Sequence, residues 1–351
     1  MSYVWSICWL TLSLAVGFAQ TTPDFPPLPD ARGRAGMMAA VLKDARGQPC
    51  ILAAGGANFP DKMPWEGGTK VFYREIFLLE KLPQGWTWRK VGDLPEACAY
   101  GAFCTSLDQR SLIIAGGANG EHHLNQVWAV PADGHVSTFS SPLTTPRAYA
   151  AFANIQGSLT IVGGTSTPEA TRALDTMTML GLHTPEAGWK TNESDPEQSR
   201  ILGFMASDDG ILLWGGGCRL SEVSQQAHRT YLEDVQYVTR QNQGVRFHGF
   251  PETLAASAGP AINVAQGFCI VGGDNGSHYG KPPATHPGHS QTILFIDQES
   301  FATKVIGTWP TPIATAPLLR LGNDLITISG ETKPGVRTPA ISHWTLPPAL
   351  R

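Results

Sequence analysis

The sequence predicts an all-β protein, a six-bladed kelch-type β-propeller in which the N-terminal segment closes the last blade. Three observations predict this fold. A short apolar strand that ends in glycine recurs along the chain at intervals of about 50 residues, the period of a kelch blade. The 351 residues include 38 glycines and 27 prolines, the poorest helix formers. Hydrophobic residues make up 42% of the chain, which is enough to fill a large core.

The repeated unit is an apolar strand followed by a glycine pair. Five copies have their first glycine at positions 55, 116, 163, 215 and 272, and a sixth copy ends at Gly330. In this sixth copy Glu331 stands where we expect the second glycine, so a carboxylate is predicted at a position that otherwise has no side chain. An Ala/Gly-rich strand precedes each copy and two strands follow it, which makes four strands per blade. Glycine suits a tight strand end where a side chain would clash.

The last unit supplies only three strands and ends near residue 346. The pattern of the missing fourth strand, with its Leu-Pro pair, occurs instead at residues 25–29. We therefore expect the N-terminal segment to complete the last blade and lock the ring, which removes an exposed sheet edge. Because no linker-like stretch separates the units, residues 20–351 are predicted to form a single domain.

The first residues indicate export from the cytoplasm. Residues 4–18 are almost wholly apolar but too few to span a membrane, and residues 17–19 followed by Gln20 resemble a cleavage site. We predict a signal peptide at residues 1–19 and a secreted or periplasmic mature protein without membrane contact. The alternative is an uncleaved anchor. Without Cys8, five cysteines and no CxxC pair remain, which favours buried free thiols over disulfides or structural zinc.

Arginines gather where one mouth of the central channel is expected. The connections between blades hold Arg32, Arg34, Arg147 and Arg200, although the formal net charge of the chain is −4. Guanidinium groups suit a carboxylate or another anion, so Arg34 and Arg147 are predicted to bind substrate. The alternative is that each arginine caps loop carbonyls between blades. The acidic balance gives no basic field for nucleic acid, and no nucleic-acid partner is expected.

Asparagines follow three of the glycine repeats, at Asn58, Asn119 and Asn275. Their place beside the expected channel mouth predicts that they bind substrate. The alternative is a turn in which each asparagine satisfies its own backbone, which is common for this residue.

The histidines are not predicted to form a metal site. His278, His286 and His289 share one Gly/Pro-rich loop, residues 275–290, and we expect this loop to fold over the channel mouth. Zinc or copper in this loop is the less favoured alternative. The sequence has no glycine-rich phosphate loop, no GxSxG motif and no Cys-His nucleophile signature.

The segment from Glu331 to Arg337 is the most informative. It places a carboxylate next to Lys333 and Arg337 at the expected channel mouth. Such a carboxylate is either half of a structural ion pair or a general base with an anion-binding arginine beside it. The spacing alone leaves both interpretations open.

These residues resemble a known family. Residues 330–338, GETKPGVRT, are similar to the GEAKPGLRT motif of the N-acetylneuraminate epimerases, or sialic acid mutarotases, which are secreted or periplasmic six-bladed kelch propellers. Residues 55–59, GGANF, are similar to the family's GGAGF motif, and the resemblance spans essentially the whole mature chain. The blade with the glutamate is last here and the GGANF blade first, an order that resembles a cyclically permuted branch of the family.

The resemblance implies an isomerase that interconverts the α and β anomers of free N-acetylneuraminate. It implies that Glu331 is the general base, and that Arg337 holds the substrate carboxylate or stabilises developing charge. We add Lys333 as a substrate-binding residue that tunes the acidity of Glu331. The expected partner is a small sugar acid, with no cofactor and no metal, and the protein is expected to be a monomer or a homodimer.

Two other functions are consistent with a kelch propeller. The main alternative is a non-catalytic module that binds a glycan or a protein at the same mouth, because propellers host many functions. A copper oxidase of the galactose oxidase type would need a convergent Tyr/His/Cys ligand set and extra domains, and the sequence indicates neither.

Overall fold

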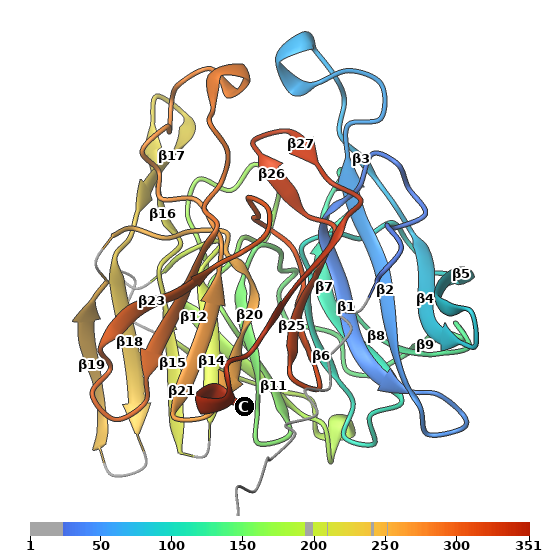
Figure 1. The fold of residues 1–351 in the computed structure, drawn as a ribbon. Coiled ribbons are helices and arrows are strands. Elements are labelled where there is room, and N and C mark those ends of the chain that lie inside the picture. The colour runs from blue at the N-terminus through green and yellow to red at the C-terminus, as the bar shows by residue number, and fades with distance from the viewer. Residues whose placement is uncertain (1–23, 194–198, 209, 240–241, 251) are drawn as a thin grey trace, which may run out of the picture.

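The computed structural model describes residues 24–351 except 194–198, 209, 240–241 and 251. These residues form six antiparallel sheets arranged as blades around a common axis (Figure 1), which confirms the predicted all-β, six-bladed propeller. The innermost strands of the blades are neighbours in chain order, and the last returns to the first. Within the described part of the chain, no helix is long and apolar enough to cross a membrane. The predicted signal peptide, residues 1–19, lies outside the described residues.

Each blade is built from strands that follow one another along the chain. The first blade contains β1 (Ala35–Lys43), β2 (Pro49–Asn58), β4 (Glu75–Leu82) and β5 (Gly85–Asp93), with the short β3 (Val71–Phe72) beside β2. The second contains β6 (Ala102–Thr105), β7 (Ser111–Ala118), β8 (His123–Pro131) and β9 (Ser137–Thr138). The third contains β10 (Ala151–Ile155), β11 (Ser158–Val162), β12 (Thr176–Gly181) and β13 (Trp189–Glu193).

The second half of the ring adds two hairpins to this plan. The fourth blade contains β14 (Phe204–Asp208), β15 (Ile211–Gly215), β18 (Asp234–Thr239) and β19 (Asn242–Gly249), with the hairpin β16 (Cys218–Val223) and β17 (Gln226–Tyr231). The fifth contains β20 (Ala258–Val264), β21 (Gly267–Val271), β22 (Thr292–Asp297) and β23 (Thr303–Thr308). The sixth contains β24 (Leu318–Leu321), β25 (Asp324–Ile328) and β28 (Ile341–Thr345), with the hairpin β26 (Glu331–Lys333) and β27 (Val336–Arg337).

Among the described residues, three short 3-10 helices lie in connections between strands and one follows β28. They are η1 (Pro64–Glu66), η2 (Pro185–Ala187), η4 (Pro283–Thr285) and η5 (Pro348–Leu350). All four begin at proline, whose fixed φ suits the first position of a helix.

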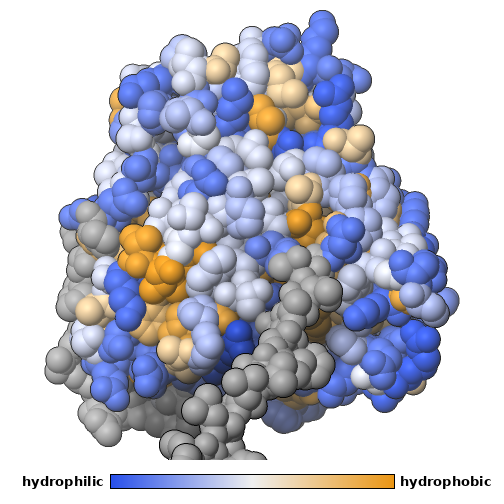
Figure 2. All heavy atoms as spheres, viewed as in Figure 1, coloured by the Kyte–Doolittle hydropathy of each residue, from blue (hydrophilic) through white to orange (hydrophobic). Residues whose placement is uncertain are grey.

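The hydrophobic core lies in the seams between neighbouring blades. One cluster joins Leu52 and Ile76 of the first blade to Phe103 and Trp128 of the second. Comparable clusters join each later pair of blades, and one joins the sixth blade to the first. Each blade is therefore held by its two neighbours. Figure 2 shows that the outer surface, viewed as in Figure 1, is mainly hydrophilic, as expected when the apolar side chains are buried in the seams.

A closed ring of backbone hydrogen bonds surrounds the channel. One residue from each blade donates its N–H to the carbonyl of its counterpart in the preceding blade, over distances of 2.7 to 3.1 Å. All of these residues have left-handed backbone conformations, with φ between 51° and 65°. In this conformation the N–H and C=O groups of successive blades face each other around the axis. The members of the ring are Gly36, Tyr100, Tyr149, Leu202, Ala256 and Thr315.

The glycine repeat has a register that differs from the prediction in two blades. The N–H of Gly330 donates to the Arg34 carbonyl in the same way that the second glycine of every other pair donates to its next blade. Ser329, with φ 57°, therefore replaces the first glycine, and Glu331 follows the pair. The expectation that Glu331 replaces a glycine is wrong by one residue. The pair of the fourth blade is likewise residues 216–217, not 215–216.

Ser329 fits at this position because its hydroxyl makes two hydrogen bonds that a glycine could not make. At the equivalent first glycines, an added Cβ would come within 2.1 to 2.3 Å of a backbone carbonyl of the next blade. In the sixth blade the Ser329 Oγ instead accepts a hydrogen bond from the Arg34 N–H and donates one to the Thr338 carbonyl, both 2.6 Å long. Ser329 thus joins the sixth blade to the first, across the seam where the two ends of the ring meet.

The N-terminal segment closes the ring, but it does so without forming a fourth strand. The Leu28 N–H donates to the Pro339 carbonyl just before β28, and the Leu28 side chain is buried against the core between the sixth and first blades. The Phe25 ring lies 5.3 Å from the Trp86 ring of the first blade and 6.0 Å from the His343 ring of the sixth. The segment is rich in proline, which cannot donate to a ladder, so it packs across the seam instead of pairing.

The cysteines agree with the prediction of free thiols. Cys50, Cys98, Cys104, Cys218 and Cys269 are all buried and unpaired by disulfides. Desolvation raises the pKa of every one of these thiols, for example that of Cys50 to about 11 and that of Cys104 to about 12. Cys8 lies outside the described residues.

Candidate active site

A cavity of about 450 Å³ opens at one end of the central channel, on the side where the hairpins β16–β17 and β26–β27 extend beyond the blades (Figure 1). It lies next to the backbone ring, and four members of the ring, Tyr100, Tyr149, Leu202 and Thr315, line it. Its charged lining consists of three cations and one carboxylate, so the cavity carries a net positive charge. The polar and aromatic residues that line it are Phe59, Lys70, Tyr100, Tyr149, Thr165, Arg229, Thr315, Glu331 and Arg337.

Glu331 and Arg337 face each other across the β26–β27 hairpin. Glu331 Oε1 accepts a 2.6 Å hydrogen bond from the Gly335 N–H and lies 3.5 Å from Arg337 Nη1. Oε2 has no hydrogen-bond partner among the described residues. Both side chains are largely shielded, with 14% of the Glu331 side chain and 3% of the Arg337 side chain exposed. One carboxylate oxygen is thus fixed by the hairpin and the other is available to a ligand.

The buried Arg337 side chain has N–H groups that make no hydrogen bond. Its Nε and Nη1 have no hydrogen-bond acceptor, and its guanidinium carbon lies 4.8 Å from the centre of the Phe59 ring. A buried guanidinium with unsatisfied N–H groups is costly, because those groups have lost water without gaining a partner. An anion that enters the cavity supplies the missing acceptors.

The hairpin holds this pair because its turn fits the neighbouring blade closely. Gly335 has φ 85°, and an added Cβ there would lie 2.7 Å from Pro64, which belongs to the loop of the first blade. Glu331 itself is fixed by a β-bridge to Ala314 at the start of its own blade. The motif at the end of the sequence and the motif near its beginning therefore meet in one site.

Two cations of the cavity were not predicted from the sequence. Lys70 belongs to the long loop after β2, and its Nζ lies 3.4 Å from the Tyr100 hydroxyl. Desolvation lowers the pKa of Lys70, an effect that Tyr149 opposes. Arg229 comes from β17 of the fourth blade, on the opposite side of the ring. Neither lies near a glycine repeat, so only the closure of the ring brings them together.

The phenols of Tyr100 and Tyr149 form the floor of the cavity. Their ring centres are 4.7 Å apart, and both residues are members of the backbone ring. Desolvation raises the pKa of Tyr100 to about 12 and also raises the pKa of Tyr149. Both phenols therefore stay protonated at neutral pH and can donate hydrogen bonds to the hydroxyl groups of a ligand.

Arg34 and Arg147 are not in the cavity, and the structure does not support the prediction that they bind substrate. Arg34 donates to the Gly55 carbonyl and pairs with Asp30 and Glu75, at 2.7 and 3.0 Å. Arg147 donates to the Gly163 carbonyl at 2.7 Å and to Thr176.

Arg200 makes the equivalent bond to the Gly216 carbonyl, so three blades share this contact, which we call the arginine clamp. In each blade the arginine comes one residue before the bridge that opens the blade, and its guanidinium fixes the first residue of the glycine pair. The geometry supports the alternative that these arginines cap carbonyls, except that each carbonyl belongs to the arginine's own blade and does not lie between blades.

The other predicted ligands also lie away from the cavity. Asn58 is buried and bonds to the Gly33 carbonyl and the Tyr73 hydroxyl. Asn119 and Asn275 accept hydrogen bonds from backbone N–H groups of their own turns. The Lys333 ammonium lies 5.9 Å from the Trp65 ring, so this lysine braces the hairpin against the loop of the first blade. Asn119 and Asn275 thus act as the turn interpretation states, whereas Asn58 ties the segment before β1 to Tyr73 instead of satisfying its own backbone.

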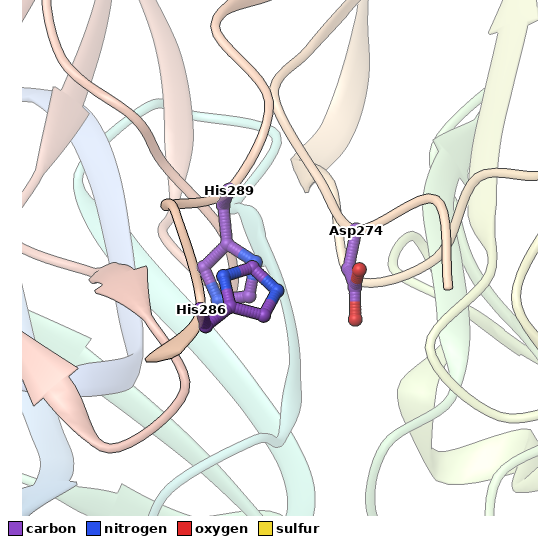
Figure 3. A group of neighbouring side chains, drawn as sticks. All are labelled: Asp274, His286 and His289. Atoms are coloured by element: carbon purple, nitrogen blue, oxygen red, sulfur yellow. The ribbon is translucent and has the colours of Figure 1, made fainter. Parts of the chain in front are cut away.

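A second polar cluster lies outside the cavity, in the loop after β21. Asp274, His286 and His289 place one possible metal-ligand atom each within 4.8 Å of one another (Figure 3). No residue of the loop from 275 to 290 lines the cavity, although the His289 N–H donates to the Thr332 carbonyl of the β26–β27 hairpin. The sequence places the three histidines in one loop but not Asp274 beside them, which reaches them because the loop folds back.

Comparisons with known proteins relate part of this chain to one group of enzymes. No family model matches the chain. Over 121 residues, 32% of the chain, it is 31% identical to N-acetylneuraminate epimerase of Haemophilus influenzae strain PittEE and 30% identical to that of strain 86-028NP. The matched part spans 30% of the length of these curated relatives.

The likeness in three dimensions extends over the whole molecule. A solved structure of YjhT superposes with a TM-score of 0.67 at 13% sequence identity, covering 92% of this chain and 97% of that chain. At this identity the likeness shows the propeller fold. The chain is therefore a six-bladed propeller that is similar, over about a third of its length, to proteins named N-acetylneuraminate epimerase.

Proposed function

We propose that this protein is a sialic acid mutarotase, an isomerase that interconverts the α and β anomers of free N-acetylneuraminate in the cavity at the channel mouth. The observation that carries the proposal is the Glu331–Arg337 pair, in which a carboxylate oxygen and two buried guanidinium N–H groups lack partners in one cavity. The partial similarity to proteins named N-acetylneuraminate epimerase supports the choice of substrate.

The cavity suits a sugar acid in size, charge and chemistry. Its volume of about 450 Å³ is in the range of small-molecule sites. Lys70, Arg229 and Arg337 outnumber the single carboxylate, which favours an anionic ligand. The phenols of Tyr100 and Tyr149 provide donors for hydroxyl groups, and their rings provide an apolar floor for a sugar ring.

Ring opening and ring closure each need two proton transfers, and neither changes an oxidation state. Glu331 takes the proton of the anomeric hydroxyl, the bond between the anomeric carbon and the ring oxygen breaks, and the ring oxygen receives a proton. The open-chain ketone then rotates about the bond to its neighbouring carbon, and the hydroxyl attacks the other face of the carbonyl. The proton returns by the reverse route, so that Glu331 is regenerated.

Arg337 stabilises the negative charge that accompanies these steps. Its Nε and Nη1 groups, which make no hydrogen bond, are available to the substrate carboxylate or to the developing alkoxide, and burial strengthens the attraction. Among the protic groups of the cavity, Lys70 is better suited than the tyrosines to protonate the ring oxygen, because desolvation lowers its pKa and raises theirs. No step requires a metal ion or a cofactor.

We also propose that the chain is a cyclically permuted relative of the bacterial epimerases and acts after export. The GGANF and GETKPGVRT motifs lie at opposite ends of the sequence, yet Arg337 lies over the Phe59 ring in one site. Because the seams hold each blade to its two neighbours, a ring keeps its contacts when the chain termini move to another seam. The apolar residues 4–18 support export to the periplasm or the exterior.

The proposal is tested by proton NMR of N-acetylneuraminate freshly released as the α anomer. Catalytic amounts of wild-type protein should accelerate the decay to the β anomer. Glu331→Gln should lose this acceleration by about 10²- to 10⁴-fold, the usual contribution of general acid–base catalysis. The amide keeps an oxygen for the Gly335 N–H, so the hairpin should stay in place. Glu299→Gln, in an exposed turn of the fifth blade, is the matched control and should remain fully active.

The same assay separates the competing functions. If the wild-type protein leaves N-acetylneuraminate unchanged but accelerates another 2-keto sugar acid, the mechanism is retained and the substrate is wrong. If no sugar acid is accelerated while sialic acid or a glycan still binds, the protein is a binding module. Full activity of Glu331→Gln would exclude Glu331 as the base.

A further inference from the structure

We propose that Asp274, His286 and His289 form a binding site for a divalent transition-metal ion, best suited to Zn²⁺, that fastens the loop from 275 to 290 to the fifth blade. The site is separate from the sugar cavity, and its test does not depend on the proposed function. In Figure 3 the two imidazoles overlap in the view and Asp274 lies across from them. Their ligand atoms lie within 4.8 Å of one another, and their ring centres are 5.3 Å apart.

Backbone contacts bring these three residues together. Asp274 directly follows the glycine pair of the fifth blade and is held by a β-bridge to Ala255. The loop then leaves the blade and returns, because the Ser290 N–H donates to the Gly273 carbonyl at 2.8 Å. The end of the loop is thereby tied to the residue before Asp274, which places His289 beside the carboxylate. His286 follows the 3-10 helix η4 and turns back toward the same point.

His289 provides an independent sign of a missing ligand. Its Nδ1 is buried and has no hydrogen-bond partner. An imidazole nitrogen that is shielded from water and bonded to nothing is destabilising unless a proton donor or a cation occupies the adjacent space.

The carboxylate is oriented for coordination by a neighbouring phenol. The Tyr231 hydroxyl donates to Asp274 Oδ2 at 2.7 Å, and the Gly276 N–H donates to Oδ1 at 3.0 Å. Each carboxylate oxygen has two lone pairs, so each keeps one for a metal ion. Hydrogen bonds of this kind fix ligand orientation in known metal sites. His286 Nδ1 accepts a bond from the Gly288 N–H at 3.1 Å, and we expect metal coordination to displace that bond.

The donor set identifies the class of ion. Two imidazoles and one carboxylate suit Zn²⁺ and its neighbours in the transition series, whereas Ca²⁺ and Mg²⁺ prefer oxygen alone. Tetrahedral zinc would separate the ligand atoms by roughly 3.4 Å, given bond lengths near 2.1 Å. Because the ligand atoms now lie within 4.8 Å of one another, the loop, which carries both histidines, needs to close by at most about 1.4 Å. Water fills the remaining position in such three-residue sites.

Metal binding would also affect the neighbouring hairpin. The backbone N–H of His289 donates to the Thr332 carbonyl, and Thr332 lies next to Glu331. An ion at this site would hold the loop as a brace against the hairpin that carries the Glu331–Arg337 pair. The ion itself would lie in a depression of about 290 Å³ that shares no lining residue with the cavity.

The test uses the full chain without a polyhistidine tag, stripped of metal by a chelator and dialysed. Isothermal titration with Zn²⁺ should show one site per chain, and Co²⁺ should give the intense visible absorption of a tetrahedral complex. Asp274→Asn, His286→Ala and His289→Ala should each weaken Zn²⁺ binding at least 100-fold. Tyr231→Phe should weaken it by about 10-fold, as outer-shell substitutions do. His135→Ala, at an exposed histidine of the second blade, should bind as the wild type does.

A second measurement does not depend on affinity. Tyr279 is exposed in the loop, so chymotrypsin should cut after it. Zn²⁺ should slow this cleavage in the wild type and in His135→Ala, but not in His289→Ala. Thermal unfolding of each variant without metal verifies that it folds. Absence of the Co²⁺ band from the wild type, or Zn²⁺ affinity within two-fold of wild type in all three ligand variants, would overturn the proposal.

Discussion

Lys70 is a cation in a place where burial opposes its charge. It reaches the cavity from the loop after β2 and contacts the Tyr100 hydroxyl, and desolvation lowers its pKa from the ordinary value of 10.5. Tyr149 and Glu331 favour the ammonium, whereas Arg337 and Arg229 oppose it. A substrate carboxylate would tip this balance toward the charged form. Binding of an anionic sugar is therefore expected to be coupled to the protonation of Lys70.

This coupling predicts a loss of affinity at alkaline pH. A lysine with a lowered pKa is charged below that pKa and neutral above it, so N-acetylneuraminate should bind more weakly as the pH rises toward 10.5. The phenols of Tyr100 and Tyr149 stay neutral in this range because burial raises their pKa. Titration calorimetry at several pH values measures the effect. Lys70→Arg, which stays charged, should show little change over the same range, and an equally steep fall in this variant would exclude Lys70 as the cause.

At the scale of single residues, the sequence predicted the pair in the hairpin but not the cations around it. Glu331 and Arg337 lie in one short motif, so their proximity can be read from their spacing. Lys70 and Arg229 are 159 positions apart in the numbering and meet only because blades one and four close the ring. Topology predicted Arg34 and Arg147 at the mouth, but neither lines the cavity, because nearby carbonyls occupy their guanidinium groups, which the sequence does not reveal.

The arginine clamps belong to the scale of the blade. Each joins the start of an inner strand to the end of the second strand, through a buried guanidinium that bonds to a glycine carbonyl. Because these hydrogen bonds are buried, water cannot replace the guanidinium as the donor to the glycine carbonyl if the arginine is removed. The clamps are therefore expected to contribute to stability and to have little influence on substrate.

Two arginine variants separate these roles. Arg147→Met should lower the free energy of unfolding by about 2–4 kcal/mol, because it leaves buried carbonyl oxygens unpaired, and should leave KM unchanged. Arg229→Met, which removes a cation of the cavity, should raise KM with little loss of stability. Urea denaturation and the anomer assay measure both quantities. A raised KM in Arg147→Met with unchanged stability would contradict the structural role of this arginine.

Substitutions at two equivalent positions of the backbone ring are predicted to change the stability of the fold in opposite directions. Ala256 has φ 56°, which is unfavourable for a residue with a Cβ, so Ala256→Gly should stabilise the fold by about 0.5–1 kcal/mol. Gly36 has φ 65° at the equivalent position, and an added Cβ would lie 2.5 Å from the Tyr100 ring. Gly36→Ala should therefore destabilise by more than about 1 kcal/mol. Denaturation midpoints test both, and changes of the same sign would show that the left-handed backbone does not decide them.

At this scale the glycine repeat predicted the number of blades but not the register of every pair. Glycine occurs in runs at residues 215–217, and backbone contacts with the next blade select which two form the pair. In the sixth blade a serine occupies the left-handed position, which the sequence alone disfavours, because its hydroxyl bonds across the closing seam. Tertiary contacts therefore override the local preference at the seam where the chain ends meet.

The whole molecule depends on how that seam is closed. Five seams join blades that are consecutive in the chain, whereas the seam between the sixth and first blades joins the two ends. The N-terminal segment lies across it, with Leu28 buried among side chains of both blades. The sequence predicted the place of this segment from its Leu-Pro pattern. It did not predict the loss of strand pairing, which follows from prolines that lack an N–H.

The closing segment is expected to control global stability. Leu28→Ala should lower the free energy of unfolding by about 2–5 kcal/mol, the usual cost of removing a buried leucine side chain. Val305→Ala, which shortens a 66% exposed side chain on β23, is the matched control and should change it by less than about 0.5 kcal/mol. Urea denaturation followed by tryptophan fluorescence measures both. The sixth and first blades share the seam that Leu28 fills, so weakening this seam destabilises both blades together. The Leu28 variant should therefore unfold at a lower urea concentration in one cooperative transition. An effect as small as that of the control would mean that the ring stays closed without the N-terminal segment.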